Sequence, residues 1–139
     1  MVELIAGNKG KGKTKLLLEK VSAAVLTATG NIVYLDKNQQ HIHELTNKVR
    51  LINVSDYPVS NCDEFIGFIC GIISQDYDLQ EMYLDSFLTI AHLKDDEVEH
   101  TILKLDEIGK NYNIKFVISI SKDEKDLPDS VKDMLIVSL

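Results

Sequence analysis

Gly7-Asn8-Lys9-Gly10-Lys11-Gly12-Lys13-Thr14 reads G-x-x-x-x-G-K-T, and it directly follows the apolar run at residues 2–6. Glycines let a backbone approach a phosphate that any Cβ would block, and successive backbone N–H groups then form a nest for the anion. A helix that begins at such a loop adds its dipole to the attraction. The stretch therefore predicts a strand, a phosphate-binding loop and a helix in succession.

The loop also predicts roles for single side chains. We expect the ammonium group of Lys13 on the β- and γ-phosphates and the hydroxyl of Thr14 on Mg²⁺. Lys9 and Lys11 are further candidates for phosphate contact, although loop lysines are more often only solvated. The expected ligands are ATP and Mg²⁺, and the expected binding residues are Gly7, Asn8, Lys9, Gly10, Lys11, Gly12, Lys13 and Thr14.

Length and charge restrict the class of protein. The chain has 139 residues, which suits one nucleotide-binding domain spanning 1–139. Its net charge of −7 argues against a basic surface for nucleic acid. No apolar run approaches the ~18 residues of a membrane span, and no charged-then-apolar signal opens the chain. We therefore expect a cytoplasmic protein that contacts neither membrane nor nucleic acid directly.

Arg50 is the only arginine among the 15 lysine and arginine residues. An arginine that stabilises phosphate charge resists replacement, because lysine cannot copy its planar fork of donors. Small-molecule and nucleotide kinases typically clamp phosphates with several arginines. A single arginine therefore makes a kinase the less favoured interpretation, and we keep it as an alternative.

Short β-branched runs alternate with longer amphipathic stretches, which predicts a three-layer α/β/α fold with a mainly parallel sheet. Residues 86–95 are expected to form a loop. Numbering six strands along the chain, we predict the order 3-2-4-5-1-6. The expected strands span 2–6, 31–36, 49–54, 81–85, 115–121 and 134–139, and the expected helices span 13–28, 62–75 and 95–111, with a helical turn at 127–132.

The segment Met82-Tyr83-Leu84-Asp85 is an apolar strand that ends in a carboxylate. Ligands of open parallel sheets lie outside the carboxyl ends of the strands. Asp85 is therefore the candidate for Mg²⁺ or its water shell, with a solvated carboxylate as the alternative. The next residue is Ser86 rather than Glu, so either the catalytic base lies elsewhere or turnover is slow.

The phosphate loop and the Asp85 strand resemble those of RecA-like ATPases, including the ring helicases. In that family an acidic residue, usually Glu, polarises the attacking water from the end of the strand after the first helix. Asp36 ends IVYLD at the matching place and is one methylene shorter. The resemblance also implies a polar sensor of the γ-phosphate at Ser119 or Ser121. With Lys13, the catalytic candidates are Asp36 and Ser119.

The same resemblance implies that Lys122 or Lys125 can act on the site of a neighbouring subunit, as basic residues beyond the sensor strand do in the family. The chain also resembles short bacterial phosphate-loop proteins that are often labelled twitching-motility ATPases. Pilus retraction motors, however, use arginine-rich catalytic motifs, which a single arginine cannot supply.

The motifs and the resemblance predict an Mg²⁺·ATP-binding domain with slow intrinsic hydrolysis, activated by a protein partner or by self-assembly. A non-hydrolysing, nucleotide-responsive adaptor is the first alternative, because no Glu follows Asp85. A GTPase is another. Its N-K-x-D motif is only approached by Lys37-Asn38, in the wrong order, and by Ser121-Lys122-Asp123.

Overall fold

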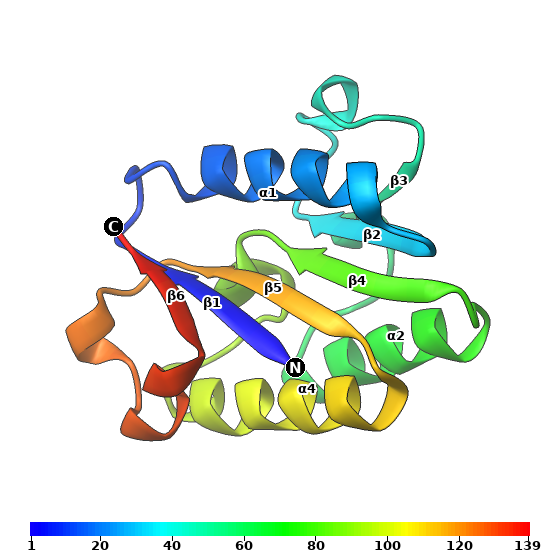
Figure 1. Cartoon of the computed structure of the whole chain (residues 1–139). Helices are drawn as coiled ribbons and strands as arrows, with labels where there is room; N and C mark the ends of the chain where they lie inside the picture. The colour runs from blue at the N-terminus through cyan, green and yellow to red at the C-terminus, as the bar shows by residue number, and fades with distance from the viewer.

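The computed structural model describes all residues, 1–139. Its centre is one six-stranded sheet with the strand order β3-β2-β4-β5-β1-β6 (Figure 1). Every neighbouring pair of strands is parallel. The predicted α/β class and strand order are thereby confirmed. The strands are β1 (Val2–Ala6), β2 (Asn31–Asp36), β3 (Val49–Asn53), β4 (Leu79–Leu84), β5 (Lys115–Ile120) and β6 (Leu135–Ser138).

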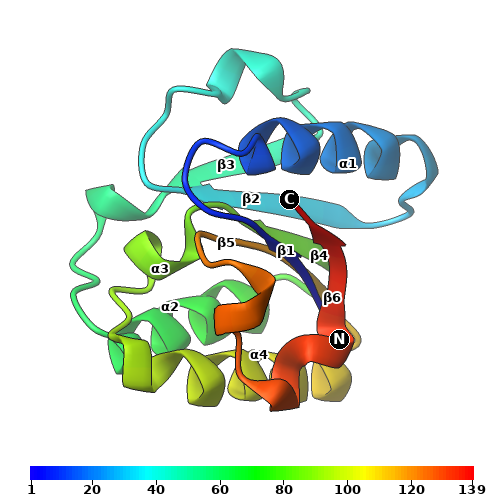
Figure 2. The same ribbon diagram turned by 90° about the vertical axis from the view of Figure 1, so that its left-hand side faces the viewer.

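Helices lie on both faces of the sheet. Figures 1 and 2 show α1 (Lys13–Thr27) on one face and α2 (Cys62–Ser74) with α4 (Val98–Tyr112) on the other. The core on the α2 and α4 face comprises 25 buried residues, against 8 beneath α1. Most of the apolar burial that stabilises the fold is thus on the α2 and α4 face.

Alternation along the strands decides which polar side chains can meet. Tyr34 packs in the core beneath α1, whereas its neighbour Leu35 packs in the opposite core. The two-residue period therefore places Asp36 on the side of α1. Tyr83 and Val117 also pack in the core beneath α1. Asp85 and Ser119 follow them by two residues and therefore lie on the side of α1 as well. Three polar side chains thus lie at the carboxyl ends of β2, β4 and β5, on the face where α1 begins.

The N-terminus of α1 is left open for a ligand. Gly10 and Gly12 have φ of 86° and 91°, a left-handed backbone that favours glycine. Gly12 is the N-cap of α1, and no side chain caps the helix. By contrast, Asn61 caps α2 by accepting the backbone N–H of Glu64 at 2.9 Å. The first-turn N–H groups of α1 are therefore available to an anion.

Several boundaries differ from those that the sequence predicts. Residues 86–95 were expected to be a loop, but they contain the short helix α3 (Phe87–Ile90), because Phe87 and Ile90 bury their side chains in the larger core. β4 ends at Leu84, so Asp85 lies just beyond it. A 3₁₀ turn at Asp95–Glu97 precedes α4, and another at Asp129–Met134 precedes β6. None of the helices combines the length and apolar character needed to cross a membrane.

Gly109, within α4, lies where a side chain has no room. A Cβ there would collide with the backbone nitrogen of Met1 and would lie 2.6 Å from the carbonyl oxygen of Ile114. We expect Gly109→Ala to lower the free energy of unfolding by about 1–3 kcal/mol through overpacking. Gly67→Ala in α2, with nothing within 4 Å of its Cβ, is the matched control. It should raise that free energy by about 0.5–1 kcal/mol, because alanine favours helix. Urea unfolding measures both, and equal effects would contradict the close approach.

Candidate functional site

A cleft of about 470 Å³ opens where β2, β4 and β5 end beside the phosphate loop. Its lining brings together most of the residues that the sequence predicts. The predicted residues that line it are Lys9, Gly10, Gly12, Lys13, Thr14, Asp85, Ser119 and the alternative sensor Ser121. The predicted residues that do not line it are Gly7, Asn8, Lys11 and Asp36.

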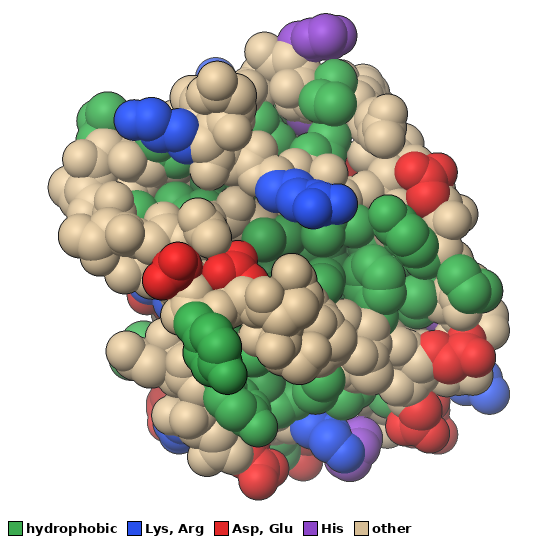
Figure 3. Space-filling view, turned by 90° about the vertical axis from the view of Figure 1, so that its right-hand side faces the viewer, with side chains coloured by type: hydrophobic (Ala, Val, Ile, Leu, Met, Phe, Trp, Pro, Cys, Tyr) green, Lys and Arg blue, Asp and Glu red, His purple; other side chains and the backbone are tan.

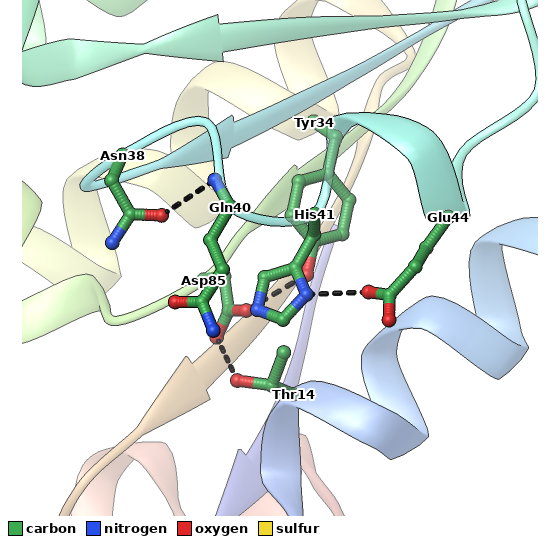
Figure 4. Close-up of polar contacts among 7 residues, drawn as sticks. All are labelled: Thr14, Tyr34, Asn38, Gln40, His41, Glu44 and Asp85. Atoms are coloured by element: carbon green, nitrogen blue, oxygen red, sulfur yellow. Dashed lines mark hydrogen bonds and ion pairs between the residues drawn. The ribbon is translucent and has the colours of Figure 1, made fainter.

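Asp85 is the centre of the polar network in this cleft, and only 2% of its surface is exposed. Its Oδ1 accepts the hydroxyl of Ser119 at 2.7 Å and the backbone N–H of Ser86 at 2.9 Å. Thr14 Oγ1 donates to the same oxygen at 3.3 Å, and the hydroxyl of Tyr34 donates to Oδ2 at 2.8 Å (Figure 4). These donors fix the carboxylate in one orientation, facing the start of α1.

Tyr34 is a site residue that the sequence reasoning missed. Its ring is buried and stacks on Tyr83, with centroids 6.3 Å apart and planes 9° from parallel. Burial, reinforced by the charge and hydrogen bond of Asp85, raises the pKa of Tyr34 far above its usual value. The phenol therefore stays a neutral donor to Asp85. A signal was present, because Tyr34 lies two residues before Asp36 and must share its face of the sheet.

Ser86 occupies the position after Asp85 where a catalytic Glu is absent. Its φ of 55° turns the backbone so that its N–H donates to both Asp85 Oδ1, at 2.9 Å, and Ser119 Oγ, at 3.0 Å. Ser119 accepts this bond and donates its own proton to Asp85. Ser119 thus orients Asp85 in this structure, and its contact with a γ-phosphate stays a prediction.

Lys13 carries a buried charge on the phosphate loop. It is 8% exposed, and its Nζ donates to the carbonyl oxygen of Asn8 at 3.1 Å. Burial lowers the pKa of Lys13, while the nearby charge of Asp85 opposes that shift. No carboxylate forms an ion pair with Lys13. An ammonium group at the cleft without a direct ion pair favours an anion at this position.

Asp36 is not among the residues that line the cleft, and it is 3% exposed. Its Oδ1 accepts the backbone N–H of Lys37 at 2.7 Å, whereas its Oδ2 is the one buried side-chain oxygen or nitrogen without a hydrogen-bond partner. Burial raises the pKa of Asp36 to about 6. The hydrogen bond from the Lys37 backbone lowers this pKa, and the nearby charge of Asp85 raises it further. A buried oxygen of this kind calls for a water or a ligand group.

The segment between β2 and β3 borders the same site. Lys37, its first residue, lines the cleft although the sequence reasoning did not select it. His41 is held farther along by its contact with Glu44, with 2.5 Å between Nδ1 and Oε2. Figure 4 shows this pair together with the contacts of Asp85. The pair fixes the segment that leads away from Lys37.

The two basic residues expected to act on a neighbouring subunit lie outside the cleft lining. Lys122 forms an ion pair with Asp95 at 3.0 Å. Asp123 accepts the backbone N–H of Lys125 at 3.1 Å, which starts a 3₁₀ turn. The roles of Lys122 and Lys125 between subunits stay predictions. Lys122 and Asp123, which belong to the stretch compared with a guanine motif, are engaged in these contacts.

A second and larger hollow, of about 820 Å³, lies along the edge strand β3 and against α2. Figure 3 views the molecule from this side and shows hydrophobic side chains gathered around a basic one. Arg50, Tyr57 and Phe68 are among the residues that line this hollow, and no residue of the phosphate loop does. Size therefore does not identify the nucleotide site. The single arginine lies outside the phosphate cleft.

No family model and no curated protein matches the chain. Among solved structures it is similar to the KaiC-like protein PH0186 of Pyrococcus horikoshii OT3, with a TM-score of 0.61 and 16% identity over 85% of this chain and 61% of that one. It is also similar to the flagellar accessory protein FlaH of Methanocaldococcus jannaschii, with a TM-score of 0.51 and 13% identity over 96% and 65% of the two chains. For domain III of the Thermotoga maritima replication initiation protein DnaA the TM-score is 0.46, with 17% identity over 96% of this chain and 50% of that one.

The chain thus spans less than two thirds of each of these structures. At such low identities the likeness shows the fold alone, the α/β arrangement that the chain shares with PH0186 and FlaH. The likeness agrees with the predicted α/β fold, and the twitching-motility label finds no support.

The raised pKa of Asp36 predicts a pH-dependent stability. Its pKa is about 6 in the fold against 3.8 ordinarily, so the folded state binds this proton more tightly than the unfolded chain does. The resulting stabilisation is complete below about pH 4 and is lost as the pH rises through 6. Asp36→Asn lacks this pH-dependent contribution. The difference in unfolding free energy, variant minus wild type, should therefore increase by up to about 3 kcal/mol from pH 4 to pH 7.5. Urea unfolding across this range measures the gain, and a constant difference would contradict burial as the cause.

Proposed function

We propose that this chain binds Mg²⁺·ATP in the phosphate cleft and hydrolyses it slowly on its own, with a protein partner or further copies of the chain as the activator. The observation that carries the proposal is the convergence of Lys13 and Thr14 with Asp85 in one cleft. These residues come from the phosphate loop and from the end of β4, two elements far apart in the sequence. The fold likeness supports nucleotide binding.

The donors in the cleft suit a magnesium nucleotide. Thr14 Oγ1 and Asp85 Oδ1 lie 3.3 Å apart, so hard oxygen ligands from two elements face one position. The left-handed backbone at Gly10 and Gly12 and the uncapped start of α1 suit a phosphate. Thr14 and Asp85 would hold the ion, and bound Mg²⁺ neutralises charge on the phosphates.

Three side chains would share the remaining work. Lys13 donates to the phosphate oxygens, and Ser119 keeps Asp85 in place. Asp36 offers its unpartnered oxygen to the attacking water; with a pKa of about 6 it is mainly ionised at neutral pH and can accept a hydrogen bond. Because Asp36 is buried outside the cleft lining and is one methylene shorter than Glu, we expect slow turnover.

A non-hydrolysing, nucleotide-responsive adaptor is the second candidate. Two features favour the adaptor: Ser86, rather than a carboxylate, follows Asp85, and Asp36 is buried outside the cleft lining. A kinase is disfavoured, because Arg50 lies in the other hollow and cannot clamp a phosphate in this cleft. Measurements of binding and of turnover separate these candidates.

Lys13→Ala should weaken Mg²⁺·ATP binding by about 10- to 100-fold, because a charge-assisted contact to phosphate is lost. Calorimetric titration with ATP, ADP and GTP in the presence of Mg²⁺ measures the change and the base preference. Lys15→Ala is the matched control, since this exposed lysine of α1 lies outside the cleft lining. Absence of nucleotide binding by the wild type would contradict the proposal.

Asp36→Asn should reduce phosphate release by at least about 100-fold, because the carboxylate that accepts from the attacking water is lost. ATP affinity should stay within about threefold, since Asp36 does not line the cleft. Single-turnover assays with saturating enzyme measure the rate. Unchanged turnover would exclude Asp36 as the base, and binding without turnover by the wild type would favour the adaptor.

A further inference from the structure

Lys37 is a free cation at the edge of the phosphate cleft. It is the first residue after β2 and lines the cleft together with the phosphate loop. Its backbone is anchored, because its N–H donates to Asp36 Oδ1 at 2.7 Å. Its side chain is exposed and forms no ion pair. An anchored backbone with an unpaired ammonium group suits an anionic ligand.

The position of Lys37 differs from that of the other cations in the cleft. Lys9 and Lys13 reach the cleft from the phosphate loop, which follows β1. Lys37 reaches it from β2, and β4 and β5 separate β2 from β1 in the sheet. A phosphate chain held by the loop would therefore meet positive charge on two sides of the cleft.

Lys37 is the only basic residue that lines the cleft on that second side. Lys122 is engaged with Asp95, and Arg50 lies in the hollow along β3. The neighbouring strand β4 carries Asp85, and Thr14 Oγ1 lies against its carboxylate. In a phosphate loop the threonine and lysine of the motif face the β- and γ-phosphates. The side of the cleft toward β4 and β2 is thus the side of the terminal phosphate.

We propose that Lys37 contacts the γ-phosphate within the same chain and so makes the site discriminate ATP from ADP. The inference rests on the proposed nucleotide site. It gives the γ-phosphate a second cation, beside Lys13, from the chain that binds it. It also links the nucleotide to the segment 38–48, which directly follows Lys37 and leads to β3.

The test compares the dissociation constants of the Mg²⁺ complexes of ADP and of a non-hydrolysable ATP analogue by calorimetry. Lys37→Ala should weaken binding of the analogue by about tenfold or more, because a charged hydrogen bond to phosphate is lost. ADP binding should change by less than about twofold, since the contacted phosphate is missing. Lys37→Arg should keep most of the discrimination, because its guanidinium also binds phosphate.

Lys48→Ala is the matched control, because Lys48 ends the same segment, carries the same charge and lines the other hollow. An equal loss in Lys37→Ala and Lys48→Ala would overturn the inference, as would equal weakening of ADP and of the analogue. Hydrogen exchange of residues 38–48 should slow with the analogue but not with ADP in the wild type, and identical exchange would also overturn it. Failure of the wild type to bind either nucleotide would instead overturn the proposed function.

Discussion

The buried carboxylate of Asp85 is the constraint on which the rest of the site depends. A charge that is 2% exposed is tolerated only when donors satisfy it. The donors come from α1, from β2, from β5 and from the backbone that follows β4. The same four hydrogen bonds that stabilise the charge also fix these elements relative to one another at the carboxyl end of the sheet.

Asp36 differs from Asp85, although both carboxylates lie at the carboxyl ends of neighbouring strands. Both oxygens of Asp85 are hydrogen-bonded, which suits the fixed orientation of a metal ligand. Asp36 has one unpartnered oxygen and a pKa of about 6. Two carboxylates in such different environments commonly take different roles in catalysis. The burial of Asp36 is unfavourable for the isolated chain above its pKa, which is the type of strain that functional sites retain.

Positive charge is distributed unevenly over the molecule. The chain has a net charge of −7, yet the cleft gathers Lys9, Lys13 and Lys37. The loop glycines and the open helix start add backbone donors to these side chains. A nucleotide in this cleft would bring negative charge to these donors, and its binding would stabilise the fold.

The parallel α/β fold class followed from the sequence because it needs only a few local patterns. Apolar runs separated by helical stretches identify a parallel sheet, and the motif at residues 7–14 with the carboxylate of Asp85 identifies the strands that border the cleft. The short helix α3 could not be recognised in this way. Its four residues show no helical period, and only the burial of Phe87 and Ile90 in the larger core makes the turn favourable.

The amino-acid sequence by itself determined the phosphate loop, the parallel α/β fold and the strand that leads to Asp85. These features depend on residues close together in the chain, where spacing and backbone preference act directly. The tertiary structure alone decided that Tyr34 and Ser119 donate to Asp85 and that Lys37, rather than Arg50, faces the cleft. Such contacts join residues tens of positions apart, and they depend on strand order, register and the direction of each side chain, which no local pattern encodes.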